Sequence, residues 1–396
     1  MARVPSRYRV DPAELVSTIL AVTGPEAVLH EPEFIGNERR YVEDAIATGW
    51  VSSSGAYVDR FERGIAEFVG SSFASATVNG TAALHAALLL SGVEADDEVI
   101  IPTLTFVGTA NAVAYLGAVP HLADSEAATL GLDPQKLDHH LRTETEFASG
   151  ACRNKRTGRR VKAVVAMHTF GHPVDLNAVA EVCSRHRLVL IEDAAESLGS
   201  YYQGQHTGTI GALGIFSFNG NKILTTGGGG MIVTNDPDLG SAAKHITTTA
   251  KVPHPWLYDH DRLGFNYRLP NLNAALGCGQ LEQLSQFLTE KRALAHKYAL
   301  ALADVPGATF IVEPPNCKSN YWLNALLLDE SAPDLRDIVL AKAHSAGLGM
   351  RPAWTPMHQL PMYADNPRMD LSVSEDLFSR LLNLPSSPKF GRGSGT

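Results

Sequence analysis

Residues 75–90 read SATVNGTAALHAALLL, a β-prone run that passes through Asn79-Gly80-Thr81 into an apolar helical pattern. A second β-prone run, EVII at residues 98–101, precedes another helical pattern over residues 107–115. The alternation continues with a strand-like run, a helical pattern and a strand-like run at residues 161–167, 175–186 and 188–191. This alternation is typical of a mostly parallel sheet covered on both faces. We therefore predict an α/β fold, with ligands beyond the carboxyl ends of the strands.

The pattern changes after a long helical stretch over residues 272–302, where Pro306 and Pro314-Pro315 interrupt the chain. A strand-like run and two helical patterns follow at residues 321–328, 334–346 and 374–382. We expect an N-terminal extension without an assigned role, a large cofactor-binding domain, and a long connecting helix with a small C-terminal α/β domain, at residues 1–32, 33–270 and 271–396. The polar residues 141–160 are expected to form a solvated surface loop, although their arginines could also meet a nucleotide phosphate.

Composition excludes several classes of protein. The 396 residues carry a formal net charge of −9, which argues against a nucleic-acid groove or an anionic membrane surface. No apolar run reaches the roughly 18 residues of a membrane span. The four cysteines form no CxxC pair and no metal-ligand spacing, so we expect reduced thiols, no metal site and a cytoplasmic protein. An anionic substrate would need local cations or backbone amides.

Lys222 ends the run Ser217-Phe218-Asn219-Gly220-Asn221-Lys222 and precedes four consecutive glycines, Gly227 to Gly230. An enclosed lysine amine can form a Schiff base with a carbonyl group. The four glycines are not a P-loop, because no GKS or GKT triplet follows them, and a tight turn explains them better. Lys222 is therefore the candidate catalytic residue, and pyridoxal phosphate is the candidate cofactor.

Pyridoxal phosphate also needs a carboxylate for its ring nitrogen and a cradle for its phosphate. The turn at residues 79–82 offers N–H groups at a helix start, which bind phosphate, although a glycine there can simply make the turn. Asp193 follows a strand and could pair with the ring nitrogen or cap a helix. Phe106 could stack on the ring or belong to the core, and Ser217 could donate to the phosphate. The order of these residues along the chain favours the cofactor site.

The chain resembles the DegT-type family of nucleotide-sugar aminotransferases from about Glu33 to Pro385. Residues 49–52, GWVS, and residues 57–62, YVDRFE, match the family's opening. Residues 264–268, GFNYR, resemble the family loop that crosses a dimer interface. The resemblance implies fold type I of the pyridoxal-phosphate-dependent transferases, with a mostly parallel seven-stranded sheet in the large domain and a smaller C-terminal α/β domain. It also implies a homodimer with shared active sites.

Roles carried over by position follow from the resemblance. Lys222 would bond to the cofactor and later move the proton between the substrate carbon and the cofactor. Asp193 would pair with the pyridine nitrogen, and Glu196 would lie near the phenolic oxygen, where many relatives have glutamine or histidine. Phe106 would stack on the ring, and Asn266 would reach the neighbouring subunit's phosphate. The phosphate in the same subunit would be held by Gly80, Thr81, Ala82 and Ser217.

The chain further resembles enzymes of the bacillosamine and legionaminic acid pathways in residues 319–324, SNYWLN, and residues 351–358, RPAWTPMH. This implies amino transfer from glutamate to C4 of a 4-keto-6-deoxy-N-acetylhexosamine on UDP or GDP, for a surface glycan or glycoprotein. Arg351 would meet a phosphate charge, Trp354 the sugar or base, and His358 a phosphate or hydroxyl. Alternatively, Trp354 could pack at the interface between the domains, and His358 could be a structural histidine with hydrogen bonds inside the protein. We expect the nearby His168 to be structural.

Two other functions stay open on the sequence alone: amination at C3 instead of C4, and a non-catalytic regulator that binds the cofactor or a sugar. A pyridoxamine-dependent sugar dehydratase is disfavoured, because such relatives carry histidine at the position of Lys222. A nicotinamide oxidoreductase is also disfavoured, since no G-x-G-x-x-G opens a helix after a strand.

Overall fold

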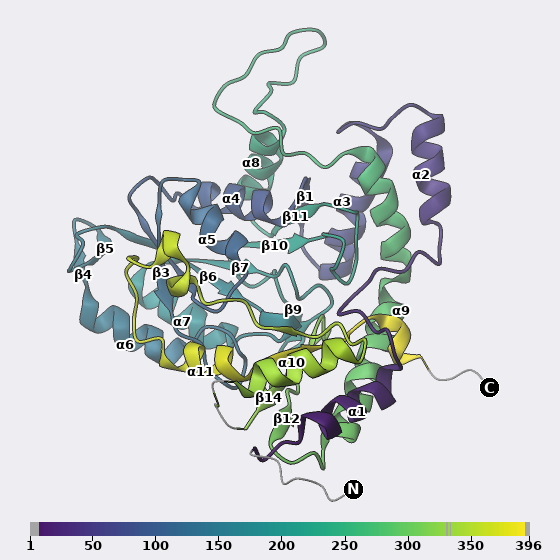
Figure 1. Ribbon diagram of the computed structural model, residues 1–396. Helices are drawn as coiled ribbons and strands as arrows, with labels where there is room; N and C mark the ends of the chain where they lie inside the picture. Colours follow the sequence, from purple (N-terminus) through teal and green to yellow (C-terminus); the bar gives the residue numbers. More distant parts are fainter. Residues whose placement is uncertain (1–7, 330–331, 333, 393–396) are drawn as a thin grey trace, which may run out of the picture.

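The large domain is built on one seven-stranded sheet (Figure 1). The computed structural model describes residues 8–329, 332 and 334–392. The strand order is β1 (Phe73–Thr77), β11 (Gly230–Thr234), β10 (Leu213–Ser217), β7 (Val189–Asp193), β6 (Val161–Met167), β2 (Glu98–Pro102) and β3 (Val119–Ala123). Strand β11 is antiparallel to both of its neighbours, and the other pairs are parallel. The predicted α/β fold with a mostly parallel sheet is confirmed.

Helices cover both faces of this sheet because alternate strand residues point to opposite sides. Ile215 packs into one core with the helices α4 (Gly80–Leu90), α5 (Val107–Ala114) and α8 (Pro237–Thr247). Its neighbour Phe216 packs into the opposite core with α2 (Glu38–Ala47), α3 (Ala56–Val69) and the first part of α9 (Asn271–Leu302). Helices α6 (Pro134–Glu144) and α7 (Leu176–His186) cover that opposite face farther along the sheet. The carboxyl ends of the parallel strands stay open between these layers.

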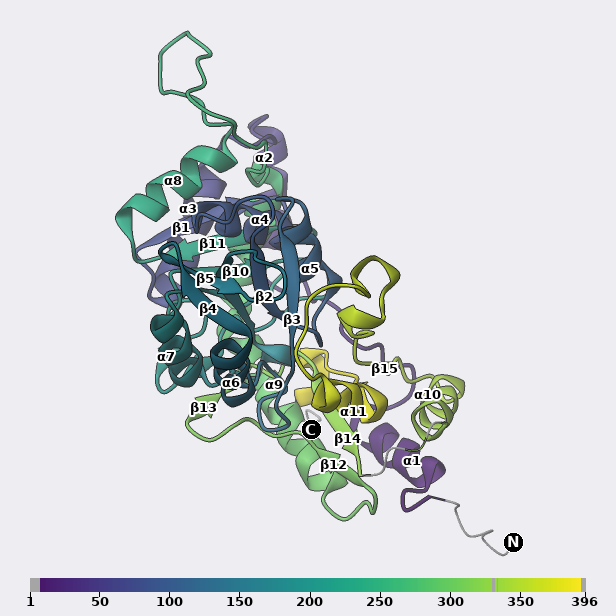
Figure 2. The same cartoon turned by 90° about the vertical axis from the view of Figure 1, so that its left-hand side faces the viewer.

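The small domain has its own antiparallel sheet, in the order β12 (Ala308–Phe310), β14 (Asn324–Leu328), β16 (Leu381–Leu384) and β15 (Arg351–Pro352). It is packed by α9, α10 (Leu335–Ser345) and α11 (Ser372–Arg380) (Figure 2). The helix expected over residues 374–382 was predicted too long. It ends at Arg380, and the next residues pair with β14, because four consecutive buried residues suit a central strand better than an amphipathic helix.

Helix α1 (Pro12–Thr23) completes the small-domain core. Leu15 and Ile19 have no exposed surface, and they pack in one cluster with Tyr298 of α9 and Val339 of α10. Asp11 caps this helix by accepting a hydrogen bond from the Ala13 amide at 2.8 Å. The sequence assigned no role to this segment, yet the structure makes it part of a hydrophobic core.

The polar residues 141–160 were expected to form a solvated surface loop, but the structure differs from this expectation. They contain an antiparallel hairpin of β4 (Thr145–Ala148) and β5 (Ala151–Asn154). Arg160 pairs with Asp97 at 2.5 Å and with Glu94 at 3.2 Å, so this arginine is already neutralised within the protein. The remaining strands form a small sheet, β13 (Cys317–Lys318), β8 (Tyr201–Tyr202) and β9 (Gln205–His206).

The segment between α8 and α9 projects away from the rest of the molecule (Figures 1 and 2). Among the described residues, no helix is long and apolar enough to cross a membrane. The same residues contain no group of three or more histidine, cysteine or acidic side chains arranged to hold a metal ion.

Candidate active site

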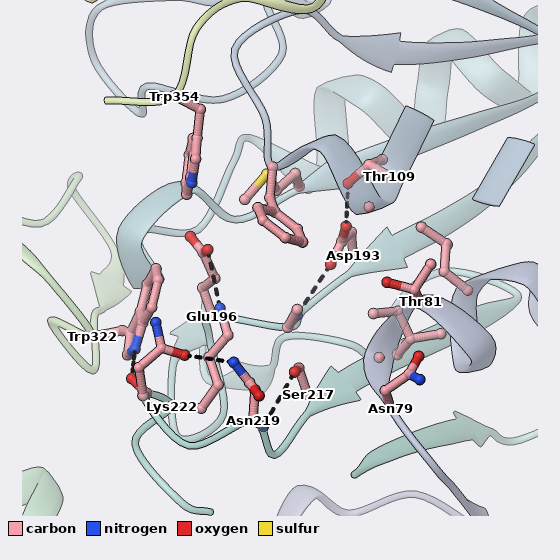
Figure 3. Close-up of a pocket in the computed structure, with 18 residues that line it drawn as sticks. Asn79, Thr81, Thr109, Asp193, Glu196, Ser217, Asn219, Lys222, Trp322 and Trp354 are labelled. Carbon is pink, nitrogen blue, oxygen red and sulfur yellow. Dashed lines mark hydrogen bonds and ion pairs between the residues drawn. The ribbon is translucent and has the colours of Figure 1, made fainter. Parts of the chain in front are cut away.

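A cavity of about 350 Å³ opens at the carboxyl ends of β6, β7 and β10 (Figure 3). The large domain supplies most of its wall, and the small domain supplies Trp322 and Trp354. Eight residues predicted from the sequence line it: Gly80, Thr81, Phe106, Asp193, Glu196, Ser217, Lys222 and Trp354. Residues separated by more than two hundred positions therefore meet at the place where α/β folds bind ligands.

Lys222 is held in a tight loop that follows β10. Its amide donates to the carbonyl of Asn219 at 3.0 Å, and its Nζ atom lies 3.2 Å from Oε1 of Glu196. The same Nζ lies 3.6 Å from the ring centroid of Trp322. Burial raises the pKa of the Glu196 carboxyl to about 7, and the adjacent Lys222 cation opposes this rise. The lysine amine is thus enclosed between a carboxylate and an aromatic face.

Asp193 ends β7 and points into the cavity. Thr109 Oγ1 donates to its Oδ2 at 2.8 Å, and the Ala195 amide donates to its Oδ1 at 3.2 Å. Burial raises the pKa of this carboxyl, although both hydrogen bonds act in the opposite direction. A cation in the cavity would favour the charged form of Asp193. The protonated ring nitrogen of pyridoxal phosphate is such a cation, so the acid fits the cofactor.

The start of α4 forms a narrow cradle beside Ser217. A Cβ atom on Gly80 would lie 2.9 Å from Cβ of Ser217, so only glycine allows this approach. Gly80 and Thr81 supply the first two amides of the helix, which have no partner in the helix itself. The Ala82 amide differs from expectation: it donates to the Asn79 side chain at 2.8 Å, and Ala82 does not line the cavity. A phosphate fits the remaining amides and the Ser217 hydroxyl.

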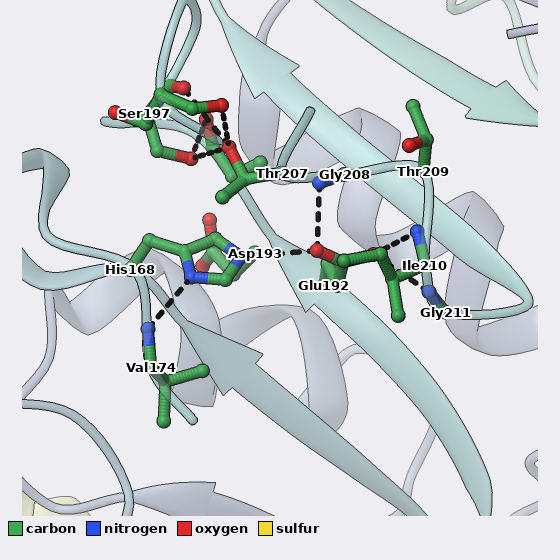
Figure 4. A network of polar contacts seen from close by, with 12 residues as sticks. His168, Val174, Glu192, Asp193, Ser197, Thr207, Gly208, Thr209, Ile210 and Gly211 are labelled. Carbon is green, nitrogen blue, oxygen red and sulfur yellow. Dashed lines mark hydrogen bonds and ion pairs between the residues drawn. The ribbon is translucent and has the colours of Figure 1, made fainter. Parts of the chain in front are cut away.

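Glu192 and His168 form a separate buried network behind the cavity (Figure 4). Glu192 accepts hydrogen bonds from the amides of Gly208, Ile210 and Gly211 at 2.6–2.7 Å, and its Oε2 lies 3.1 Å from Nε2 of His168. Burial alone would raise the pKa of Glu192, but these hydrogen bonds bring it below its usual value. This network ties residues 208–211 to β7, and it supports the structural reading of His168.

Besides Ala82, three predicted residues lie outside the cavity wall. Nδ1 of His358 lies 2.9 Å from Oγ1 of Thr103, and Nε2 lies 2.9 Å from Oε1 of Glu375, which favours the structural alternative for this histidine. Arg351 is exposed on β15. Asn266 is exposed at the base of the projecting segment, where Thr248 forms a bridge with it.

Several wall residues were not predicted from the sequence, above all Thr109 and Trp322. Thr109 and Asn111 are the two polar side chains in the helical pattern over residues 107–114, and Thr109 lies about one turn after Phe106. Its polar character there could have marked it as a candidate. Trp322 lay within a quoted motif, but nothing in its neighbourhood linked it to Lys222. Its Nε1 donates to the carbonyl of Asn221 at 2.8 Å, which fixes the indole over the lysine loop. Trp354 packs against Phe170, with ring centroids 5.0 Å apart.

Comparison with known proteins agrees with this geometry. Residues 32–394 match the sequence profile of the DegT/DnrJ/EryC1/StrS aminotransferase family. EpsN of Bacillus subtilis, described as a candidate pyridoxal phosphate-dependent aminotransferase, is 38% identical over 364 residues, which are 90% of each chain. The GDP-perosamine synthase of Caulobacter vibrioides is 36% identical and covers 91% of this chain and 93% of its own.

A solved structure gives the same answer for the fold. The aminotransferase TlmJ of Streptoalloteichus hindustanus superposes with a TM-score of 0.81 at 28% identity, over 91% of this chain and 93% of its own. The chain therefore belongs to the DegT/DnrJ/EryC1/StrS aminotransferase family. It is a nucleotide-sugar aminotransferase that depends on pyridoxal phosphate.

Proposed function

We propose that the protein transfers an amino group from glutamate to C4 of a nucleotide-linked 4-keto-6-deoxyhexose or its N-acetyl derivative. The product would be a 4-amino-4,6-dideoxy sugar for a surface polysaccharide or glycoprotein, made in the cytoplasm. The observation that carries the transamination is the placement of Lys222 Nζ in a cavity that also holds Asp193 and the Gly80 cradle. One amine, one acid and one phosphate site are the groups this chemistry needs.

Two observations support the choice of sugar. Residues 319–324 and 351–358 resemble enzymes of the bacillosamine and legionaminic acid pathways, and both segments bring a tryptophan, Trp322 or Trp354, to the cavity wall. GDP-perosamine synthases, which by name make a GDP-linked amino sugar, are 35–36% identical over more than nine tenths of this chain. The identity of the nucleotide is therefore to be decided by experiment, in which UDP-linked and GDP-linked sugars are compared.

Each wall residue has a task in this reaction. Pyridoxal phosphate, when bound, supplies an electron sink for the carbon that loses its proton. Asp193 would hold the proton on the pyridine nitrogen, and Thr109 fixes the orientation of its carboxylate. Nζ of Lys222 accepts the proton from the donor carbon and later delivers a proton to the sugar carbon. Because one amine serves both steps, both proton transfers occur on the same side of the cavity.

The remaining wall positions the ligands. The amides of Gly80 and Thr81 and the Ser217 hydroxyl would bind the phosphate, and Phe106, whose side chain is half exposed at the cavity, would pack on the ring. Trp322 and Trp354 limit the access of water from the small-domain side. These groups position the reacting atoms and keep competing hydrolysis out.

A homodimer would complete the site. The projecting segment exposes large apolar side chains, with Trp256 76% and Tyr258 80% exposed, and such a group is typical of an interface. Asn266 at the base of this segment would reach the phosphate in the neighbouring subunit. Sedimentation velocity would test this arrangement, and a monomer that keeps full activity would exclude it.

A visible-absorption titration tests the reaction directly. The purified protein is loaded with pyridoxal phosphate, glutamate is added, and UDP- or GDP-linked 4-keto-6-deoxy sugars follow. We expect the cofactor band to disappear with glutamate and to return with one of the sugars. A band that never returns would reject these sugars but keep the transaminase. NMR of the product distinguishes amination at C4 from amination at C3.

The Lys222→Ala variant tests the role of the lysine. It should lose the Schiff-base band, and turnover should fall by about 1000-fold or more because no general base remains. Lys342→Ala is a matched control, since Lys342 lies exposed on α10 and does not line the cavity. Full activity of Lys222→Ala in cells would instead favour the non-catalytic regulator.

A further inference from the structure

Lys222 lies between Glu196 and Trp322, on the side of the cavity away from Asp193 and the phosphate cradle (Figure 3). Its Nζ lies 3.2 Å from Oε1 of Glu196 and 3.6 Å from the centroid of the Trp322 ring. Only 12% of the lysine side chain and 2% of the Glu196 side chain are exposed. A carboxylate and the face of an indole both attract an ammonium group, and their attraction strengthens away from water.

Other parts of the protein hold both partners in place. Oε2 of Glu196 accepts a hydrogen bond from the Phe170 amide at 2.9 Å, which leaves Oε1 for the lysine. Phe170 adopts a φ of 56°, a left-handed conformation that is costly for a bulky residue and is retained where the surroundings demand it. Trp322 is fixed by its own hydrogen bond to the Asn221 carbonyl, and the carbonyl of Trp322 accepts one from the buried Lys291 at 3.0 Å.

We propose that Glu196 and Trp322 form a docking site that holds the Lys222 ammonium in the cofactor-free protein and in the pyridoxamine form, between the two proton-transfer steps. In a transaminase the lysine must leave the cofactor in each half of the cycle. Between the two proton transfers a free amine beside the cofactor would compete with the amino group that is being transferred, whereas an ammonium is not nucleophilic. The proposal rests on the transaminase activity of the family and not on the identity of the sugar.

The charges around Glu196 set the pH range of this docking. The charged side chains that act on its carboxyl are Lys222, which favours ionisation, and Asp193, which opposes it. His168 in the neighbouring turn contacts Glu192 instead. Because the pKa of Glu196 is raised to about 7 by burial, its carboxylate is available above that pH and is lost as the pH falls below it. Docking should therefore weaken on the acid side.

Binding of the two cofactor forms tests the proposal without glutamate or sugar. Pyridoxal phosphate bonds to Lys222 and must empty the docking site, whereas pyridoxamine phosphate leaves it filled. Loss of docking should therefore tighten pyridoxal phosphate relative to pyridoxamine phosphate. We expect the Kd ratio of pyridoxamine to pyridoxal phosphate to rise about tenfold in Glu196→Gln, and about threefold in Trp322→Leu. Trp322→Phe, which keeps an aromatic face, should stay close to wild type.

The pH dependence and lysine labelling provide the controls. Below about pH 6 the wild-type ratio should approach that of Glu196→Gln, since the carboxylate is then protonated. In cofactor-free protein, trace acetylation of Lys222 at pH 7 should be several-fold faster in Glu196→Gln, with Lys244, which is bonded to Glu62, as internal reference. An unchanged ratio with both Kd values raised equally would overturn the proposal and leave Glu196 an ordinary cofactor contact. A sugar that fails to react would not affect either measurement.

Discussion

At the scale of single residues, the site depends on side chains whose charge is set by burial. Asp193 is buried at the cavity wall, which raises the pKa of its carboxyl. A hydrogen bond from Thr109 fixes the orientation of this carboxyl. Lys222 and Glu196 neutralise each other at 3.2 Å. These groups are therefore sensitive to substitutions that keep their shape and alter only their charge or hydrogen bonding.

The Asp193→Asn variant should bind cofactor but lose activity. The amide cannot stabilise a protonated ring nitrogen, so the electron sink weakens and we expect kcat to fall about 100-fold. Absorption spectra would report the bound cofactor, and single-turnover rates would report the chemistry. Asp304→Asn, at an exposed position, is the matched control. Near-normal rates for Asp193→Asn would remove this residue from its proposed role.

Thr109→Val separates orientation from charge. Valine keeps the shape of threonine but cannot donate to Oδ2 of Asp193, so the carboxylate gains freedom to rotate. We expect a fall in kcat of about tenfold, equal to the loss of one hydrogen bond to a charged group. Thr109→Ser should retain most activity because its hydroxyl can still donate. Equal losses in both variants would indicate a packing role instead.

At the scale of elements, the site depends on how strand ends are connected. Strand β7 ends in Glu192 and Asp193, whose side chains point to opposite faces of the sheet. Asp193 reaches the cavity, whereas Glu192 holds residues 208–211 by three amide hydrogen bonds. The same strand therefore positions the candidate catalytic-site acid on one face and secures the entry to β10 on the other.

Glu192→Gln should lower the free energy of unfolding by about 2 kcal/mol, since charge-assisted hydrogen bonds are replaced by neutral ones. The pKa of Glu192 is lower in the folded protein than in the unfolded chain, so its stabilisation is present near pH 7 and is lost as the pH falls into the acid range. Urea unfolding should show a smaller loss of stability on acidification in the variant. Glu94→Gln, at an exposed carboxylate, should change stability by less than about 0.5 kcal/mol.

At the scale of the whole molecule, the small domain is assembled from both ends of the chain. Helix α1 packs against α9 and α10, and Trp322 and Trp354 reach across to the large domain. The cavity therefore depends on the docking of two domains. Buried Asn320 strengthens this junction, because its side chain donates to the carbonyls of Glu196 and Leu198 at 2.9 Å.

Ile19→Ala tests whether α1 belongs to the core. Removing a completely buried side chain should cost about 3 kcal/mol through lost burial and the cavity left behind. Leu300→Ala is the matched control, because Leu300 is 66% exposed on α9 and should cost less than about 0.5 kcal/mol. Denaturant unfolding at pH 7 measures both. Equal stability of the two variants would show that α1 is dispensable for the small domain.

The sequence by itself determined the alternation of strands and helices, the position of the cavity at strand ends, and the order of residues around Lys222 and Asp193. These features are local: periodicity, turn residues and short spacings specify each element and what lies at its end. It also carried the family resemblance, which the comparisons confirm. The bounds of most central elements agree with the structure within a few residues.

Only the tertiary structure decided which distant residues meet. Trp322 lies one hundred positions after Lys222, and Thr109 lies 84 positions before Asp193. His358 contacts Thr103 and Glu375, and α1 packs into a core that could not be predicted from the sequence of α1 alone. The physical reason is that such contacts depend on the packing of several elements at once. A hydrophobic pattern shows which face of an element is buried, but it does not specify which residue of another element packs against that face.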